Sequence, residues 1–326
     1  MTVDLRVDLG RGVVLANPVG LASGTAGFGF ELAEFLDINR VGALYTKGTT
    51  RLARVGNPPP RVAETSAGML NSIGLQNPGV EHVASDYAPA FARWSCAVIV
   101  NVAGATVDEY VDCVSILDQA DGIAGYELNI SCPNIAQGLD YGRDPQAAAR
   151  VTAAVRSVTE RCVIVKLSPN VTDIAAVARA VESAGADAVS AVNTYVGMKI
   201  HRHARRPVLP RQGTGGLSGP AIKPLALAAV AAVRAALSIP VIGVGGIADA
   251  GDAIDFMVAG ADAVQVGTAT FSDPAVALRI VDGLVAYALS EGVGRLTELR
   301  WSPEAGGDPA RVSTGVGPVA PGEASC

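Results

Sequence analysis

Short, continuously apolar runs recur along the chain, and amphipathic stretches separate most of them. A run that is apolar at every position is typical of a strand buried on both faces, as in a parallel sheet covered by helices. Eight such runs predict an α/β protein built as a (β/α)8 TIM barrel, with a doubly wound sheet as the structural alternative. The runs are residues 19–23, 43–47, 97–102, 125–130, 163–167, 188–193, 240–244 and 263–266.

Helical spacing of apolar residues is clearest in the second half of the chain, after the fourth to eighth runs. It predicts helices over residues 144–160, 173–184, 220–237, 248–258 and 274–289. Two short runs, residues 3–9 and 12–15, flank the turn-like pair Gly10-Arg11. They predict a small β-hairpin before the first barrel strand.

Three long connections, residues 48–94, 131–143 and 194–219, follow the carboxyl ends of predicted strands. Connections of this length in a compact domain are usually functional, and barrels build their active sites on that face. We therefore expect residues 1–300 to form one catalytic barrel domain. Residues 301–326, rich in Gly, Pro and Ala, are expected to form a flexible C-terminal tail.

The composition favours a large buried core and argues against charged polymers as partners. Only 17% of the residues are charged, against about 25% in an average soluble domain. The net charge is −6 and no basic block is present, which argues against nucleic acid and anionic membranes. Arg234 and Pro240 interrupt the apolar residues 225–246, a pattern that fits a helix followed by a strand better than a membrane span.

The cysteines and the first residues predict a cytoplasmic protein. Asp4, Arg6 and Asp8 stand where a secretory signal would be apolar. The five cysteines are scattered, with no CxxC pair and no metal-like spacing, as expected of reduced thiols.

Polar residues gather where the predicted strands end. Any single Asn there would usually be a turn residue. Lys166 is harder to dismiss, because it lies in a strand otherwise built for burial, where a buried ammonium needs a partner such as a ligand anion. Cys132, in the stretch NISCPN, reads from its position alone either as a reactive thiol or as a small core residue.

These residue types favour a ligand that has a planar, polar heterocycle and a phosphate group. Asn can donate to a carbonyl and accept from a ring N–H, and glycine turns after strands seven and eight often bind phosphate in barrels. The strand-end face has no cluster of His or carboxylates for a metal, and no Ser-His-Asp motif is recognisable. The stretch GVGGIA (residues 243–248) fits a Rossmann motif, but it lies in the seventh unit and lacks the expected acidic residue at the next strand end.

Four stretches together resemble one known family. NISCPN combines with GNPPPRVAETSAGMLNSIGLQNPG (residues 56–79), VKLSPNVTD (residues 165–173) and TGGLSGPAIKP (residues 214–224). Over residues 3–300 the chain resembles class 1 dihydroorotate dehydrogenases, most closely the class 1B catalytic subunit. The resemblance implies an FMN-binding TIM barrel that oxidises (S)-dihydroorotate to orotate in pyrimidine (UMP) biosynthesis.

The resemblance also implies roles for individual residues. Cys132 matches the base that removes the C5 proton, while the flavin N5 takes the C6 hydride. The positions that match substrate contacts are Lys47, Asn71, Ser72, Ile73, Gly74, Leu75, Asn129, Asn134, Asn193 and Thr194. The positions that match flavin contacts are Ser23, Lys47, Gly48, Asn101, Asn129, Lys166, Val192, Gly219, Gly245, Gly246, Gly267 and Thr268.

The resemblance further implies a homodimer and an electron-transfer subunit carrying FAD and an iron–sulfur cluster, which passes electrons to NAD. The main alternative keeps the fold and FMN but oxidises a dihydropyrimidine such as dihydrouracil. A non-catalytic flavin-binding barrel and a phosphate-binding isomerase are further alternatives on the same fold.

Overall fold

Eight parallel strands close into a barrel within the residues that the computed structural model describes, which are 3–131, 141–209 and 213–301. The strands follow one another around the barrel in chain order, and the last pairs with the first, Val264 opposite Val19. This confirms the TIM barrel and excludes the doubly wound sheet. The barrel strands are β3 (Val19–Leu21), β4 (Ala43–Tyr45), β7 (Ala97–Val102), β8 (Gly125–Asn129), β9 (Cys162–Lys166), β10 (Ala188–Ala191), β15 (Val241–Val244) and β16 (Ala263–Val266).

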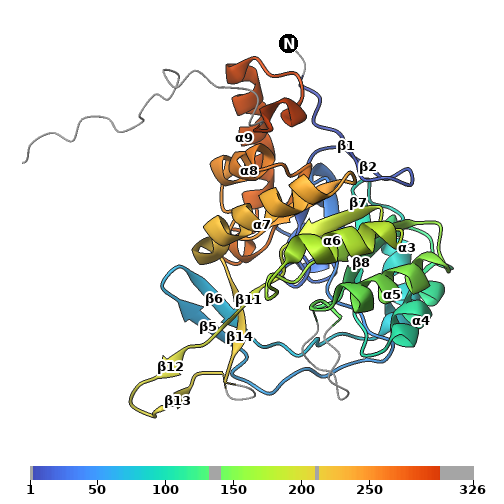
Figure 1. Ribbon diagram of the computed structural model, residues 1–326, viewed down its shortest axis with the longest axis vertical. Helices are drawn as coiled ribbons and strands as arrows, with labels where there is room; N and C mark the ends of the chain where they lie inside the picture. Colours follow the sequence, from blue (N-terminus) through green and yellow to red (C-terminus); the bar gives the residue numbers. More distant parts are fainter. Residues whose placement is uncertain (1–2, 132–140, 210–212, 302–326) are drawn as a thin grey trace, which may run out of the picture.

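Helices surround this barrel (Figure 1). The five helices that the sequence predicts are all present, although they begin or end a few residues away from the predicted bounds. The long helices are α4 (Val107–Leu117), α5 (Pro145–Arg156), α6 (Ile174–Ser183), α7 (Lys223–Ala236), α8 (Ala250–Val258) and α9 (Val276–Glu291). Shorter helices are α1 (Phe30–Ala33), α2 (Val80–His82) and α3 (Ala88–Phe91).

Side-chain caps explain where four of these helices start. Thr106, Asp144, Asp173 and Asp249 each accept a hydrogen bond from a backbone N–H in the first turn of the helix that follows. Such caps satisfy donors that have no partner inside the helix. The helices predicted to begin at Asp144 and Asp173 therefore begin one residue later, with those residues as caps.

The predicted N-terminal hairpin is present and closes one end of the barrel. Strand β1 (Val7–Asp8) pairs antiparallel with β2 (Val14–Leu15). Leu9, Val13 and Leu15 are buried against the apolar interior side chains of the barrel strands, including Ile99 and Ile164. The amino-terminal end of the barrel is thereby sealed, which leaves the carboxyl end for a site.

Two of the long connections are largely folded, which the sequence did not indicate. Parts of both form one antiparallel sheet at the other end of the barrel, in the order β11-β14-β6-β5 (Figure 1). The strands are β5 (Val62–Thr65), β6 (Gly68–Asn71), β11 (Tyr195–Gly197) and β14 (Gly215–Ser218). A Cβ on Gly68 would lie 2.0 Å from the carbonyl oxygen of Ser218, so glycine is needed for the two backbones to approach this closely.

The basic stretch 199–206 extends from this sheet as an exposed hairpin of β12 (Ile200–His201) and β13 (Arg206–Pro207) (Figure 1). Among the helices that the structure describes, none combines the length and the apolar character needed to cross a membrane. The expected flexible tail lies outside the described residues, apart from its first residue, Trp301.

Candidate active site

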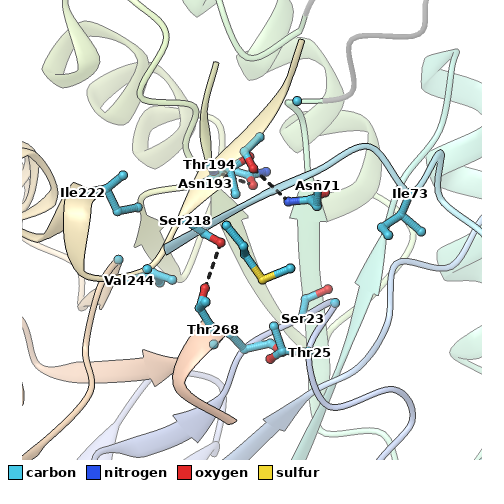
Figure 2. A pocket seen from close by; sticks show the side chains of 18 of the residues that line it. Ser23, Thr25, Asn71, Ile73, Asn193, Thr194, Ser218, Ile222, Val244 and Thr268 are labelled. Carbon is cyan, nitrogen blue, oxygen red and sulfur yellow. Dashed lines mark hydrogen bonds between the residues drawn. The ribbon is translucent and has the colours of Figure 1, made fainter. Parts of the chain in front are cut away.

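A cavity of about 630 Å³ opens at the carboxyl ends of the barrel strands, between the strand ends and the four-stranded sheet (Figure 2). This volume lies within the usual range for small-molecule sites. Every described residue that the sequence singles out as a substrate or flavin contact lines this one cavity. They are Ser23, Lys47, Gly48, Asn71, Ser72, Ile73, Gly74, Leu75, Asn101, Asn129, Lys166, Val192, Asn193, Thr194, Gly219, Gly245, Gly246, Gly267 and Thr268.

Cys132 and Asn134, the proposed base and a proposed substrate ligand, lie outside the described residues. Their roles stay predictions. Ser131, which precedes Cys132 in the sequence, lines the cavity.

Parallel strand register brings the polar strand ends together. Asn129 at the end of β8 lies opposite Lys166 at the end of β9. The Asn129 Oδ1 accepts a hydrogen bond from Asn193 Nδ2 at 3.1 Å, and Asn193 Oδ1 in turn accepts from the backbone N–H of Thr194 at 2.8 Å. These bonds orient the two amides, so both present fixed donors and acceptors to a ligand.

The four-stranded sheet forms the outer wall of the cavity. Asn71 at the end of β6 donates from Nδ2 to the carbonyl oxygen of Gly216 in β14 at 3.2 Å. Residues from two connections, the one after β4 and the one after β10, are thus joined in one wall of the cavity. Met69, Asn170 and Ser218 also line the cavity, although the sequence did not single them out.

Lys47 follows β4 and is a partly buried cation that lines the cavity. Burial lowers the pKa of its ammonium group, and the neighbouring Arg61 lowers it further, while Glu31 acts in the opposite direction. Both dominant effects disfavour the isolated charge, so an anionic group bound beside Lys47 would be stabilised there. The role of Lys47 as a substrate contact stays a prediction.

The glycine turns after β15 and β16 form a cradle in the wall of the cavity. Gly246 has φ +77°, and a Cβ there would lie 2.9 Å from the carbonyl oxygen of Gly219. Beside this turn Thr268 Oγ1 donates to Ser218 Oγ at 2.8 Å (Figure 2). Backbone N–H groups without side chains around them can approach a phosphate closely.

The floor of the cavity is polar and buried. Lys166 is 5% exposed, and its Nζ donates to Glu127 at 3.4 Å and to Gln265 at 3.1 Å. From the sequence a ligand anion was one candidate partner for Lys166, but in the structure its partner is the carboxylate of Glu127. Glu127 could have been noticed, since it is a charged residue inside an equally apolar strand.

The cavity fits a flavin mononucleotide in three respects. The glycine cradle suits the phosphate, and the ammonium of Lys166 suits the electron-rich end of a reduced ring. Asn101 supplies the third, because its Oδ1 is buried and no donor among the described residues reaches it. A ring N–H is the kind of group that would satisfy that oxygen.

The fold and the cavity thus define a (β/α)8 barrel with a small-molecule site at the carboxyl ends of its strands, where barrel enzymes place their chemistry. The Rossmann reading of residues 243–248 is wrong, because that stretch follows the seventh strand of a closed barrel.

Comparison with known proteins narrows this class to one family. A family model described as dihydroorotate dehydrogenase matches residues 9–287. The catalytic subunit of dihydroorotate dehydrogenase B (NAD(+)) from Desulforamulus reducens is 50% identical over 300 residues, which are 92% of this chain and 98% of the relative. The subunit of the same name from Porphyromonas gingivalis is 50% identical over 91% of this chain and 97% of the relative. The chain belongs to the dihydroorotate dehydrogenase family, and its resemblance to class 1B is confirmed.

Proposed function

We propose that this chain oxidises (S)-dihydroorotate to orotate in pyrimidine biosynthesis, with FMN as the bound cofactor and Cys132 as the base. The observation that carries the proposal is the gathering of all its described candidate residues around one cavity in a chain of this family. The reaction removes a proton from C5 and a hydride from C6 of the substrate, and a C5–C6 double bond forms. Bound FMN would supply the acceptor for the hydride.

The protein would bind the substrate by charge and by amide pairing. Lys47, which lies just after β4 and lines the cavity, would face the substrate carboxylate. Asn71, Asn129 and Asn193 pair with the carbonyls and N–H groups of the pyrimidine ring, which needs both donors and acceptors. Inside a protein cavity, where the effective dielectric constant is lower than in water, such hydrogen bonds are electrostatically stronger than in water.

Cys132 would take the C5 proton as a thiolate. The described cysteines do not compete for this role, because Cys96, Cys113 and Cys162 are buried and do not line the cavity. Burial raises the pKa of each of these three thiols to about 12. A general base must be substantially deprotonated near the working pH, and thiols with so high a pKa are protonated there.

Electrons would leave through a partner subunit. The relatives are named catalytic subunits of an enzyme that uses NAD(+), which supports a separate partner and NAD as the final acceptor. We propose that the partner carries FAD and an iron–sulfur cluster, that this chain forms a homodimer, and that it acts in the cytoplasm. The names of the relatives do not favour the dihydrouracil alternative.

Steady-state turnover tests the proposal. The purified chain is loaded with FMN and supplied with dihydroorotate or dihydrouracil, with ferricyanide, fumarate or NAD as acceptor. We expect orotate formation with ferricyanide, and NAD reduction only when a co-expressed partner subunit is present. Brisk oxidation of dihydrouracil without orotate formation would contradict the proposed substrate.

A further inference from the structure

A carboxylate that does not line the cavity lies directly beneath its floor. Glu127 is in β8 and its side chain is fully buried, and two of the residues that it contacts, Asn101 and Lys166, do line the cavity. An ionised carboxylate is strongly disfavoured inside a protein unless it is paired and hydrogen-bonded. Its position in the barrel interior therefore needs an explanation.

Four donors from four other barrel strands converge on this carboxylate. Its Oε2 accepts from Asn101 Nδ2 at 2.7 Å and from Lys166 Nζ at 3.4 Å. Its Oε1 accepts from Ser190 Oγ at 2.8 Å and from Gln265 Nε2 at 2.6 Å. All four donors are buried, so Glu127 is the centre of a closed polar layer between the apolar barrel interior and the cavity.

Two of the four donors, Asn101 and Lys166, belong to the cavity floor. A carboxylate only accepts hydrogen bonds, so Asn101 must turn its NH2 group to Glu127 and its oxygen elsewhere. That oxygen is the one that no donor among the described side chains and backbone groups reaches. Glu127 thereby fixes Asn101 as an acceptor for a ligand N–H.

The charges in this layer also balance. Glu127 carries the negative charge that offsets the ammonium of Lys166, and both are buried. A buried ion pair is weak evidence for stability, since apolar side chains of similar volume often serve as well. A functional role accounts for the pair better than packing does.

We propose that Glu127 is a positioning residue that sets the electron affinity of the flavin. Its carboxylate limits the positive potential that Lys166 presents to the ring and holds Asn101 in its acceptor orientation. The inference rests on the proposed binding of FMN. Glu127 does not touch the ligand and acts through the two floor residues.

The test compares the affinities of the folded protein for oxidised and reduced FMN. In Glu127→Gln the shape is nearly kept and one negative charge is lost. Reduced FMN carries more negative charge, so we expect its affinity relative to oxidised FMN to rise at least tenfold. For a two-electron couple this corresponds to a potential higher by about 30 mV.

Asp187→Asn is the matched control. Asp187 precedes β10 at the sealed end of the barrel and pairs with Arg156 at 2.8 Å. This substitution also removes one carboxylate from an ion pair, but far from the cavity. We expect lower stability and an unchanged ratio of the two FMN affinities. An unchanged ratio in Glu127→Gln as well would overturn the proposal.

A second pair of variants serves if Glu127→Gln does not fold. Lys166→Met is compared with the double variant Lys166→Met/Glu127→Gln, whose floor is neutral. The double variant should again favour reduced FMN at least tenfold more than the single variant, and equal ratios would overturn the proposal. Failure of the wild-type chain to bind FMN at all would overturn the proposed function and this inference together, whereas normal wild-type binding with equal ratios would overturn the inference alone.

Discussion

The glycine turn after β15 gives a sharp test of the phosphate cradle. Alanine at Gly246 must adopt φ +77°, a left-handed conformation that costs a residue with a Cβ about 1–2 kcal/mol. Its Cβ would also lie 2.9 Å from both the carbonyl oxygen of Gly219 and the Cβ of Lys223. Carbon atoms pack at about 3.5–4.0 Å, so the turn must move by roughly 0.5 Å or more.

Gly292→Ala is the matched control for this strain. Gly292 ends α9 with φ +68°, and a Cβ there would meet no atom within 4 Å. The left-handed conformation should therefore lower the free energy of unfolding of either apoprotein by about 1–2 kcal/mol, and the Cβ overlap at Gly246 should lower it further. Only Gly246→Ala should also displace backbone N–H groups from the phosphate.

We expect Gly246→Ala to raise the dissociation constant of FMN at least tenfold, about 1.4 kcal/mol, and Gly292→Ala to leave it unchanged. Quenching of flavin fluorescence on titration measures the affinity, and denaturant unfolding of the apoproteins measures the strain. If Gly246→Ala loses stability as expected but binds FMN like the wild type, the cradle is not where the phosphate binds.

Two further substitutions test the proposed base and the proposed carboxylate site. Cys132→Ser should leave FMN binding intact and slow dihydroorotate oxidation greatly at neutral pH, with partial recovery at high pH, because a hydroxyl ionises far less readily than a thiol; unchanged turnover would remove Cys132 from the mechanism. Lys47→Met should raise the KM for dihydroorotate by about 10-fold or more, since a charged hydrogen bond contributes about 1.5–3 kcal/mol, whereas Lys199→Met in the exposed hairpin should not. The wild-type KM should be lowest near neutral pH, where the Lys47 ammonium is charged. Because the pKa of Lys47 is lowered, KM should increase as the pH is raised, and the increase should begin at a lower pH than that at which a free lysine loses its proton. A KM that stays constant through that range would contradict this role.

The barrel was predictable from the sequence because its strands are buried on both faces and its helices on one. Both patterns are local, and the strand Ala97–Val102 was predicted to the residue. The four-stranded sheet was not predictable in the same way. Its strands have only three or four residues, and β6 pairs with β14 across about 145 positions of sequence. Nothing local in Gly215–Ser218 indicates that partner.

The sequence predicted which residues form the candidate site better than it predicted the hydrogen-bond partners of their side chains. Parallel strands bring their carboxyl ends to one face, so Asn101, Lys166 and Thr268 could be grouped from the sequence alone. The side-chain partners could not be derived, because they depend on rotamers and on barrel closure. Glu127 stands out in the sequence as a charge inside an apolar strand, but its four donors are brought together only by the closed barrel.

The central claim, that this cavity holds a flavin which dihydroorotate reduces, is tested most directly by anaerobic mixing. The FMN-loaded chain is mixed with dihydroorotate in the absence of an acceptor, and flavin absorbance and orotate are followed together. We expect the flavin to bleach as stoichiometric orotate forms, and dihydrouracil to cause neither change. A flavin that stays oxidised with dihydroorotate, or that dihydrouracil bleaches faster, would contradict it.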